Sequence, residues 1–250
     1  MSTIDKTDVS IIGYGRFGPV LTGLLKASHN VTAFDLADIS QLAPVTGATP
    51  CTWEVAMQAE TIFLAVPIRE LKYVVAKMAK DIKPGQTVID VCSVKVYPAT
   101  VLKEHLPDGV QIIASHPLFG PDSFGEGYSD LPIMMHPVST PGTAYQYWHN
   151  HFSQLGLRVI EMTPEEHDRI AARTQGITHF VGRVLTEYGI APTAIDTEGF
   201  RDLLGVVEQT CNDSLQLFHD LENYNPYTME MVGQLMKAME TVRAGIIRRD

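Results

Sequence analysis

The first 162 residues alternate short apolar runs with amphipathic stretches, and this pattern predicts their fold. Five apolar runs have the length of buried strands and lie at residues 8–15, 31–35, 61–67, 87–93 and 110–117. Several are separated by stretches with helical periodicity, such as residues 69–82. Strands that alternate with helices pair in parallel, because each helix carries the chain back across one face of the sheet. We therefore predict a parallel sheet covered by helices on both faces.

Two more strands are predicted later in this region, at residues 131–137 and 157–162, with a helix over 142–155 between them. After Met162 only helical periodicity continues. The predicted helices of this last part span about 164–188, 197–221 and 227–248.

The helical part opens with clear helix-start signals. Thr163 is expected to cap a helix that has Pro164 at its first position and Glu166 at the capping-box position. We place a domain boundary here, with one domain over residues 1–162 and a second over 163–250.

The second domain is small for a unit that must bury its own core. Its 88 residues are expected to dock on the first domain or on a second subunit. Apolar stripes run through residues 201–218 and 229–239, and they exceed what a small monomer exposes. This predicts a homodimer formed through the helical domain.

A glycine-rich loop follows the first predicted strand. Gly13, Gly15 and Gly18 have the G-x-G-x-x-G spacing, and a helical pattern follows them. Gly13 would allow a tight turn, Gly15 would admit a pyrophosphate, and Gly18 would let the helix pack closely with its N-terminus facing that anion. Asp35 ends the next strand, about 20 residues further on, where an acid bonds a ribose hydroxyl. Glycines that serve only turns are the alternative, but strand, helix and acid together favour a dinucleotide.

The predicted fold class is therefore α/β: a Rossmann-type, parallel-sheet dinucleotide-binding domain followed by an all-helical C-terminal domain. The residues expected to bind the cofactor are Gly13, Tyr14, Gly15, Arg16, Phe17, Gly18, Asp35, Val66 and Pro67. Leu36 follows Asp35, with no Arg or Lys nearby to meet a 2′-phosphate. An acid at this position repels that phosphate, so NAD is favoured over NADP.

Composition and charge narrow the possible partners. The formal net charge of −10 argues against nucleic acid and against anionic membranes, since both bind clustered Lys and Arg. No apolar run reaches the roughly 18 residues that span a bilayer, and the polar start predicts no signal peptide, so the cytoplasm is the expected compartment. Cys51, Cys92 and Cys211 lie too far apart for a disulfide framework or a zinc knuckle, and no metal is expected.

Two polar residues end predicted strands at the edge where the nicotinamide is expected. They are Ser93, which ends the strand over 87–93, and His116, at the end of the strand over 110–117, where the chain turns at once. In open α/β sheets these carboxyl ends line the ligand crevice. A histidine titrates near neutrality and suits the removal of a hydroxyl proton as hydride leaves the same carbon. The alternative is a structural histidine that caps a loop. The position beside a dinucleotide crevice favours a catalytic role for His116, with Ser93 orienting the ring or bonding the substrate oxygen.

Three sequence blocks resemble the prephenate and arogenate dehydrogenases of tyrosine biosynthesis. They are "DVCSVK" (90–95), "SHPLFGPDSF" (115–124) and "EEHDRIAARTQGITHF" (165–180). They occur in the family's order, and the resemblance runs from the glycine loop to about residue 235. "HPLFGP", "SVKVYP", "QGITH" and "NDS" are most similar to the arogenate-type branch of plants, whereas many bacterial prephenate enzymes have a Ser-His-Leu-Pro-His run where this chain has Gln175 to His179.

The resemblance implies an NAD-dependent oxidative decarboxylation of a small molecule. The ring hydroxyl loses its proton, hydride passes from the same carbon to the nicotinamide, and loss of CO₂ makes the ring aromatic. By this match His116 is the base, and Ser93 orients it or touches the substrate. Gln175, Thr178 and His179 are implied to face the substrate from the opening helix of the second domain.

The match departs from the family where a carboxylate would be held. Prephenate enzymes often carry a second arginine in a "GFRDxxR" segment, but this chain has Gly205 at that position. Lys95, Arg183 and Arg201 are the remaining candidates, and Lys95 is included in the predicted substrate site.

Asp213 stands where arogenate-type enzymes tend to carry an acid. A carboxylate attracts the ammonium of arogenate and gains nothing from the keto group of prephenate, so arogenate is favoured and prephenate is the alternative. An exposed helix acid without a role is the other interpretation of Asp213. His167 and Asp168 also match the family, but we interpret them as mainly structural because they lie one turn inside a helix start.

Two further hypotheses remain open at this point. Pyrroline-carboxylate reductases and β-hydroxyacid dehydrogenases share a sheet domain followed by helices, but they leave the "SHP" block unexplained. A dinucleotide-binding regulator without catalysis would keep the glycine loop and Asp35 but would have no reason to bring His116 and Ser93 together.

Overall fold

The computed structural model describes residues 7–121, 127–139 and 142–246. It forms two compact units, Met1–Pro164 and Glu165–Asp250, so the division falls two residues after the boundary drawn from the sequence. Each unit is described by itself.

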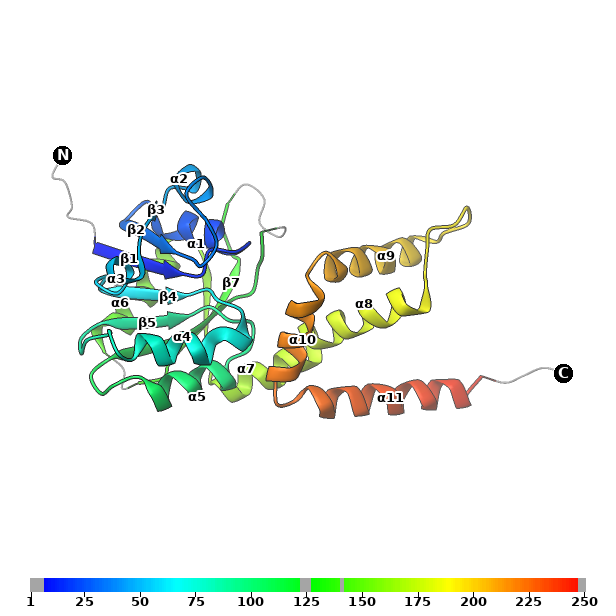
Figure 1. The fold of residues 1–250 in the computed structure, drawn as a ribbon. Coiled ribbons are helices and arrows are strands. Elements are labelled where there is room, and N and C mark those ends of the chain that lie inside the picture. The colour runs from blue at the N-terminus through cyan, green and yellow to red at the C-terminus, as the bar shows by residue number, and fades with distance from the viewer. Residues whose placement is uncertain (1–6, 122–126, 140–141, 247–250) are drawn as a thin grey trace. The chain divides into compact units, whose positions relative to one another are not determined.

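Unit 1 is built on a sheet of eight strands in the order β3-β2-β1-β4-β5-β6-β7-β8 (Figure 1). The strands are β1 Thr7–Ile12, β2 His29–Phe34, β3 Thr49–Pro50, β4 Thr61–Leu64, β5 Thr87–Asp90, β6 Gln111–Pro117, β7 Pro132–Pro137 and β8 Arg158–Glu161. All seven predicted strands are present, and the two-residue β3 was not predicted. Neighbouring strands are parallel except β6 and β7, which are antiparallel, so the sheet is mixed rather than wholly parallel as expected.

Helices and short turns of helix cover both faces of this sheet (Figure 1). They are α1 Gly18–Leu25, α2 Leu42–Thr46, α3 Trp53–Ala56, η1 Ile68–Glu70, α4 Leu71–Met78, α5 Val96–His105 and α6 Thr143–Gln154. On one face, alternate strand residues such as Phe63, Ile89 and Ile113 join Leu21 of α1 and Trp148 of α6 in one buried cluster. The strands contribute alternate residues to this cluster, because successive side chains of a strand point to opposite faces of the sheet. Helices α4 and α5 lie side by side along the sheet.

All regular elements among the described residues of unit 2 are helices, joined by loops (Figure 1). Its elements are α7 Pro164–Ala171, the π-helical segment η2 Ala172–Gly176, α8 Ile177–Tyr188, α9 Glu198–Cys211, α10 Leu215–Tyr224 and α11 Thr228–Ala244. Pro164 opens α7 as predicted. The single helix predicted over 197–221 is wrong: it breaks between α9 and α10, where the Ser214 hydroxyl accepts a hydrogen bond from the Leu217 amide at 3.1 Å and caps a new helix.

Helices α8 and α9 approach each other closely at one glycine. A Cβ atom added to Gly182 would lie 2.0 Å from Oγ1 of Thr210, far inside contact distance. This close approach depends on the absence of a side chain at position 182. Among the residues that the structure describes, no helix has the length and apolar character needed to cross a membrane.

Candidate active site

Three neighbouring parallel strands of unit 1, β1, β4 and β5, end at the same level, and the adjacent β6 continues beyond it to Pro117. Ile12 of β1 pairs with Leu64 of β4, Leu64 with Asp90 of β5, and Asp90 with Ala114 of β6. The residues that follow these four positions therefore share one edge of the sheet. This edge carries the predicted residues Gly13 to Gly18, Val66, Pro67, Ser93 and His116.

The glycine loop leaves space where a pyrophosphate would lie. Gly13 has a φ of 91°, and a Cβ there would lie 2.6 Å from the Ala65 carbonyl oxygen and 2.9 Å from Cγ1 of Val66. Only glycine fits this turn. A Cβ on Gly15 would meet no atom within 4 Å, so the backbone is open to a ligand on that side. The residues present therefore fit a dinucleotide whose phosphates face the N-terminus of α1, which begins at Gly18.

Asp35 and Tyr14 hold this loop together. The amide of Tyr14 donates to Oδ2 of Asp35 at 2.5 Å, and the amide of Ala37 donates to Oδ1 at 2.8 Å. The ring of Tyr14 is buried, and its hydroxyl lies 2.6 Å from the hydroxyls of both Thr22 and Thr46. Tyr14 can therefore offer a cofactor only its backbone. The same ring occupies the space that a Cβ on Gly18 would enter, at 2.7 Å.

The other predicted cofactor residues differ in exposure. Arg16 and Pro67 are exposed, whereas Phe17 is half-buried against the hydrophobic cluster. Val66 is half-buried beside Gly13.

His116 lies at the end of strand β6, as in the strand predicted over 110–117, and it pairs with Met134 of β7. It is 4% exposed. Because strand side chains alternate between faces, His116 shares a face with Ala114 and with Asp90, the register partner of Ala114. Ser93 is half-buried in the segment between β5 and α5. The end of the "SHPLFGPDSF" block, residues 122–124, lies outside the described residues.

Lys95, one of the predicted substrate residues, is held in the protein interior. Its side chain is fully buried, and its ammonium bonds to Oδ1 of Asp90 and, at 2.5 Å, to the carbonyl oxygen of Ser115. These contacts favour a structural role for the ammonium over the predicted contact with a substrate carboxylate. The sequence pattern could not show this, because a lysine after a strand is usually a solvated residue.

The polar residues predicted in unit 2 follow one side of a helix. Gln175 in η2, His179 in α8 and Arg183 are spaced by four residues, which places them on one face. A guanidinium nitrogen of Arg183, Nη2, donates to the carbonyl oxygen of Asp213 at 2.6 Å. Thr178 is half-buried, and its hydroxyl donates to the Thr174 carbonyl at 2.9 Å.

His179 is the buried centre of this group. Burial lowers its pKa, the Asp213 carboxylate opposes that shift, and the Arg183 guanidinium adds to it. The pKa shift indicates a mainly neutral imidazole at neutral pH. Within the described part of the chain, three buried polar atoms of this face have no hydrogen-bond partner: Oε1 of Gln175, Nδ1 of His179 and Nε of Arg183.

Arg201, the third candidate cation, is exposed, and its Nη1 donates to the carbonyl oxygen of Asp196 at 2.8 Å.

His167 and Asp168 form a buried pair, Nδ1 to Oδ1, at 2.8 Å. The Asn225 amide donates to the Asp168 carbonyl at 2.8 Å, which ties α7 to the segment before α11. These contacts fit the structural interpretation of His167 and Asp168.

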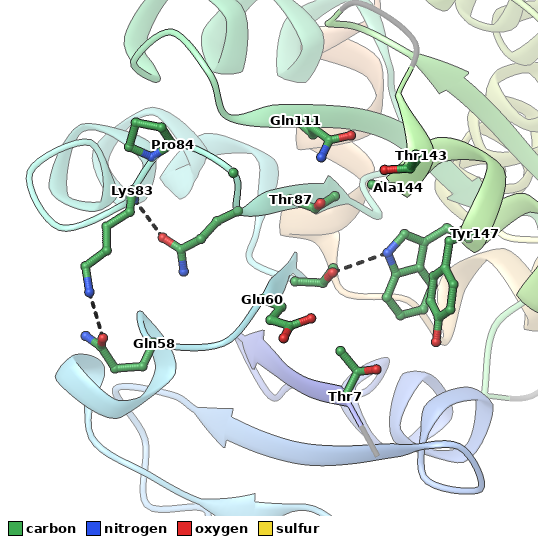
Figure 2. Close-up of a pocket in the computed structure, with 14 residues that line it drawn as sticks. Thr7, Gln58, Glu60, Lys83, Pro84, Thr87, Gln111, Thr143, Ala144 and Tyr147 are labelled. Carbon is green, nitrogen blue, oxygen red and sulfur yellow. Dashed lines mark hydrogen bonds between the residues drawn. The ribbon is translucent and has the colours of Figure 1, made fainter. Parts of the chain in front are cut away.

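A cavity of about 640 Å³ opens at the opposite edge of the sheet (Figure 2). The amino ends of β1, β4, β5 and β6 line it, with the start of α6, and Figure 2 shows Thr7, Glu60 and Thr87 around it. The predicted site residues lie at the carboxyl edge instead, so strand geometry rather than cavity size locates the site. In the part of the chain that the structure describes, no cluster of three or more His, Cys, Asp or Glu side chains could hold a metal ion.

Comparisons with known proteins assign the chain to a family. Residues 25–161 match the model "Prephenate dehydrogenase, nucleotide-binding domain", and residues 184–250 match "TYRAAT1-like, C-terminal domain". Arogenate dehydrogenase 2 (chloroplastic) of Arabidopsis thaliana is 30% identical over 96% of this chain and 70% of its own. Arogenate dehydrogenase 1 (chloroplastic) of the same plant is 31% identical over 96% of this chain, which spans 39% of that relative.

Two solved structures share the fold. Prephenate dehydrogenase from A. aeolicus, in complex with hydroxyphenyl propionate and NAD+, has a TM-score of 0.79 at 17% identity, covering 97% of this chain and 91% of its own. The Synechocystis arogenate dehydrogenase has a TM-score of 0.73 at 19% identity, covering 95% of this chain and 91% of its own. With the glycine loop and the strand-end histidine in place, the chain belongs to the prephenate/arogenate dehydrogenase family of oxidoreductases.

Proposed function

We propose that this protein catalyses the NAD-dependent oxidative decarboxylation of arogenate to tyrosine, with prephenate as the alternative substrate. The observation that carries the choice of arogenate is the position of Asp213 beside His179 and Arg183, in the face predicted to bind substrate. Two relatives that align with 96% of this chain, at 30% and 31% identity, bear the name arogenate dehydrogenase, which supports the same substrate class.

The choice of NAD rests on the residues around Asp35. Both carboxylate oxygens accept backbone amides, so the charge is fixed at the end of β2 beside the glycine loop. A fixed negative charge disfavours a 2′-phosphate, and the neighbouring Leu36 is 92% exposed and offers no cation. When bound, the nicotinamide supplies the hydride acceptor. The chain's own task is to orient the substrate and to remove one proton.

His116 is the proposed base. It lies at the edge of the sheet where the nicotinamide of such domains is found, and it is shielded from bulk water. A neutral imidazole there accepts the proton of the ring hydroxyl, while the Ser93 hydroxyl orients the imidazole or bonds the substrate oxygen. Loss of CO₂ then makes the ring aromatic, which supplies the driving force.

The carboxylates and the ammonium of the substrate require opposite charges. Gly205 lacks the arginine that related enzymes use, and Lys95 is committed to the interior. We assign the carboxylate-binding role to Arg183, whose buried Nε has no hydrogen-bond partner among the described residues. Asp213 is assigned to the ammonium, and Gln175, Thr178 and His179 to the polar groups between them.

The first experiment measures turnover. Purified protein is given NAD with arogenate or with prephenate, and the absorbance of the reduced cofactor is followed. Wild type is expected to turn over arogenate faster, and His116→Asn to lose most of the activity while still binding NAD. If neither substrate is turned over faster than by the His116→Asn control, the proposed function is wrong. Tight NAD binding without turnover would then favour the regulator hypothesis.

The second experiment tests substrate choice through Asp213→Asn. A hydrogen bond to a charged group contributes about 1.5–3 kcal/mol, so kcat/KM for arogenate should fall about ten- to a hundredfold while that for prephenate is kept or rises. Arg183→Gln serves as the contrast, because it should weaken both substrates alike. Equal losses for both substrates in Asp213→Asn would remove the argument for arogenate.

We also propose that the protein forms a homodimer through unit 2. Helix α11 and the residues after it expose large apolar side chains along their length: Met229, Met236, Met239, Val242 and Ile246. Exposed apolar surface of this extent is typical of an interface. Light scattering at micromolar concentration should give the mass of a dimer, and a monomer under those conditions would refute the proposal.

A further inference from the structure

We propose that Lys95 is a positioning residue for the catalytic edge: its buried ammonium ties Asp90 of β5 to the backbone of Ser115 in β6 and so fixes Ser93 and His116. The catalytic consequence rests on the function proposed above. The contacts themselves do not.

The contacts form a latch between two strand ends. Lys95 Nζ donates to the Asp90 carboxylate and to the Ser115 carbonyl, and Lys95 is fully buried. The Ser115 hydroxyl in turn donates to the Asp90 carbonyl at 2.8 Å. Oδ1 of Asp90 also accepts the amide of Cys92 at 3.1 Å. Asp90 and Ser115 are thus connected in two ways: through the Lys95 ammonium, and directly through the hydrogen bond from the Ser115 hydroxyl to the Asp90 carbonyl.

The latch brackets both predicted catalytic residues. His116 follows Ser115 directly, and Ser93 lies between Cys92 and Lys95. The residues that precede His116 and Ser93, which are Ser115 and Cys92, therefore both bond to the same buried ion pair. Reacting groups must be held to within a fraction of an ångström for efficient proton transfer, so a rigid support beneath them is a catalytic asset.

Stability alone does not account for this ion pair. Burying two opposite charges costs desolvation that their attraction does not always repay, and apolar side chains of similar volume often serve the fold as well or better. Directed hydrogen bonds, in contrast, fix a backbone orientation that apolar packing leaves free. The pair lies near the carboxyl ends of β5 and β6, where it can orient the backbone that carries Ser93 and His116.

The test uses a charge-neutral double variant, Asp90→Asn/Lys95→Met, because Lys95→Met alone leaves an uncompensated buried carboxylate. Asn keeps the acceptor for the Cys92 amide, and Met keeps most of the volume of the lysine stem. The control is Phe63→Leu, a truncation in the buried core of neighbouring β4 that should lower Tm without touching the latch. Kinetics are compared at equal folded fraction, judged by circular dichroism.

The double variant should lose kcat by about ten- to a hundredfold, with KM and the Kd for NAD within about twofold of wild type. Phe63→Leu should keep kcat. An unchanged kcat in the folded double variant would overturn the proposal. A raised KM with unchanged kcat would also overturn it, and would restore Lys95 as a substrate-binding residue.

A second readout does not require turnover. In ¹⁵N-histidine-labelled protein, the signals of His116 are those absent from His116→Asn. They should change position or broaden in the double variant and stay as in wild type in Phe63→Leu. Signals that superpose in all three proteins would refute the latch. If wild type turns over neither substrate, the proposed function fails, and this spectrum still decides the inference.

Discussion

Unit 1 contains a cluster of two histidines and two aromatic side chains, and the charge state of the histidines should control the stability of the unit. Nε2 of His151, in α6, donates to the Leu24 carbonyl at 3.1 Å. The ring centroid of His151 lies 4.8 Å from that of His29 and 5.3 Å from that of Trp148. His29 is buried, stacks on Trp148 at 4.9 Å and bonds the Tyr147 hydroxyl at 2.7 Å. A proton added to His151 would place a charge inside this apolar cluster.

Burial lowers the pKa of His151 from 6.5 to about 4, and the neighbouring His29 adds to the shift. The folded state therefore favours the neutral ring, whereas the unfolded chain takes up a proton at higher pH. This stabilisation is fully present above pH 6.5 and is lost as the pH falls from there through 4. At about 1.4 kcal/mol for each unit of pKa, the loss reaches at most about 3 kcal/mol.

The assay is urea unfolding of wild type and His151→Gln between pH 7.5 and 4, followed by tryptophan fluorescence. Both tryptophans, Trp53 and Trp148, lie in unit 1, so the signal reports on this unit. His151→Gln loses packing at every pH but cannot be protonated. The difference in unfolding free energy, wild type minus variant, should shrink as the pH falls below about 6.5. A difference that is constant over the whole range would refute the role of His151.

Three further predictions follow from single residues. Gly13→Ala places a Cβ 2.6 Å from the Ala65 carbonyl at positive φ, so NAD binding measured by fluorescence titration should be lost and Tm should fall. Gly182→Ala should lower the Tm of unit 2, and Thr210→Ala should restore part of it because the colliding hydroxyl is removed. Burial raises the pKa of Glu222 from 4.5 to about 7, so its contribution to stability is present below pH 4.5 and is lost as the pH rises through 7. Glu222→Gln should therefore stabilise at pH 8, by at most about 3 kcal/mol, and not at pH 4, as measured by chemical unfolding followed by far-UV circular dichroism.

Much of the fold could be predicted because its signals are local. Apolar runs bounded by turn residues marked seven strands, and Pro164 marked the start of α7. The direction of β7 could not be predicted, because an antiparallel strand has the same local pattern as a parallel one and differs only in its long-range partner. The break at Asn212 to Ser214 was also missed. Apolar periodicity continues across it, and only the capping hydroxyl of Ser214 distinguishes two helices from one.

The site was predictable to the extent that backbone topology determines it. Residues after parallel strands must share an edge, and this brought the glycine loop, Ser93 and His116 together in the prediction and in the structure. The contacts of Lys95 could not be predicted, because its partners Asp90 and Ser115 belong to two different strands and their approach is a property of the sheet. The spacing of residues along the sequence does not show which residues of neighbouring strands come into contact.

Buried polar groups are satisfied differently in the two places where chemistry is proposed. At the edge of the sheet, the Lys95 ammonium is bonded to a carboxylate and a carbonyl, so it is already satisfied. Along the helix face of unit 2, buried atoms of Gln175, His179 and Arg183 have no hydrogen-bond partner among the described residues. A buried donor or acceptor left unpaired costs about 1–3 kcal/mol, and a polar ligand that bonds several of them recovers that cost on binding. The same atoms discriminate against any molecule that lacks the matching groups, because such a molecule would leave them unpaired. Substrate selection is therefore expected to depend on the helix face and proton removal on the sheet edge, so variants of the first should change KM and specificity and variants of the second should change kcat.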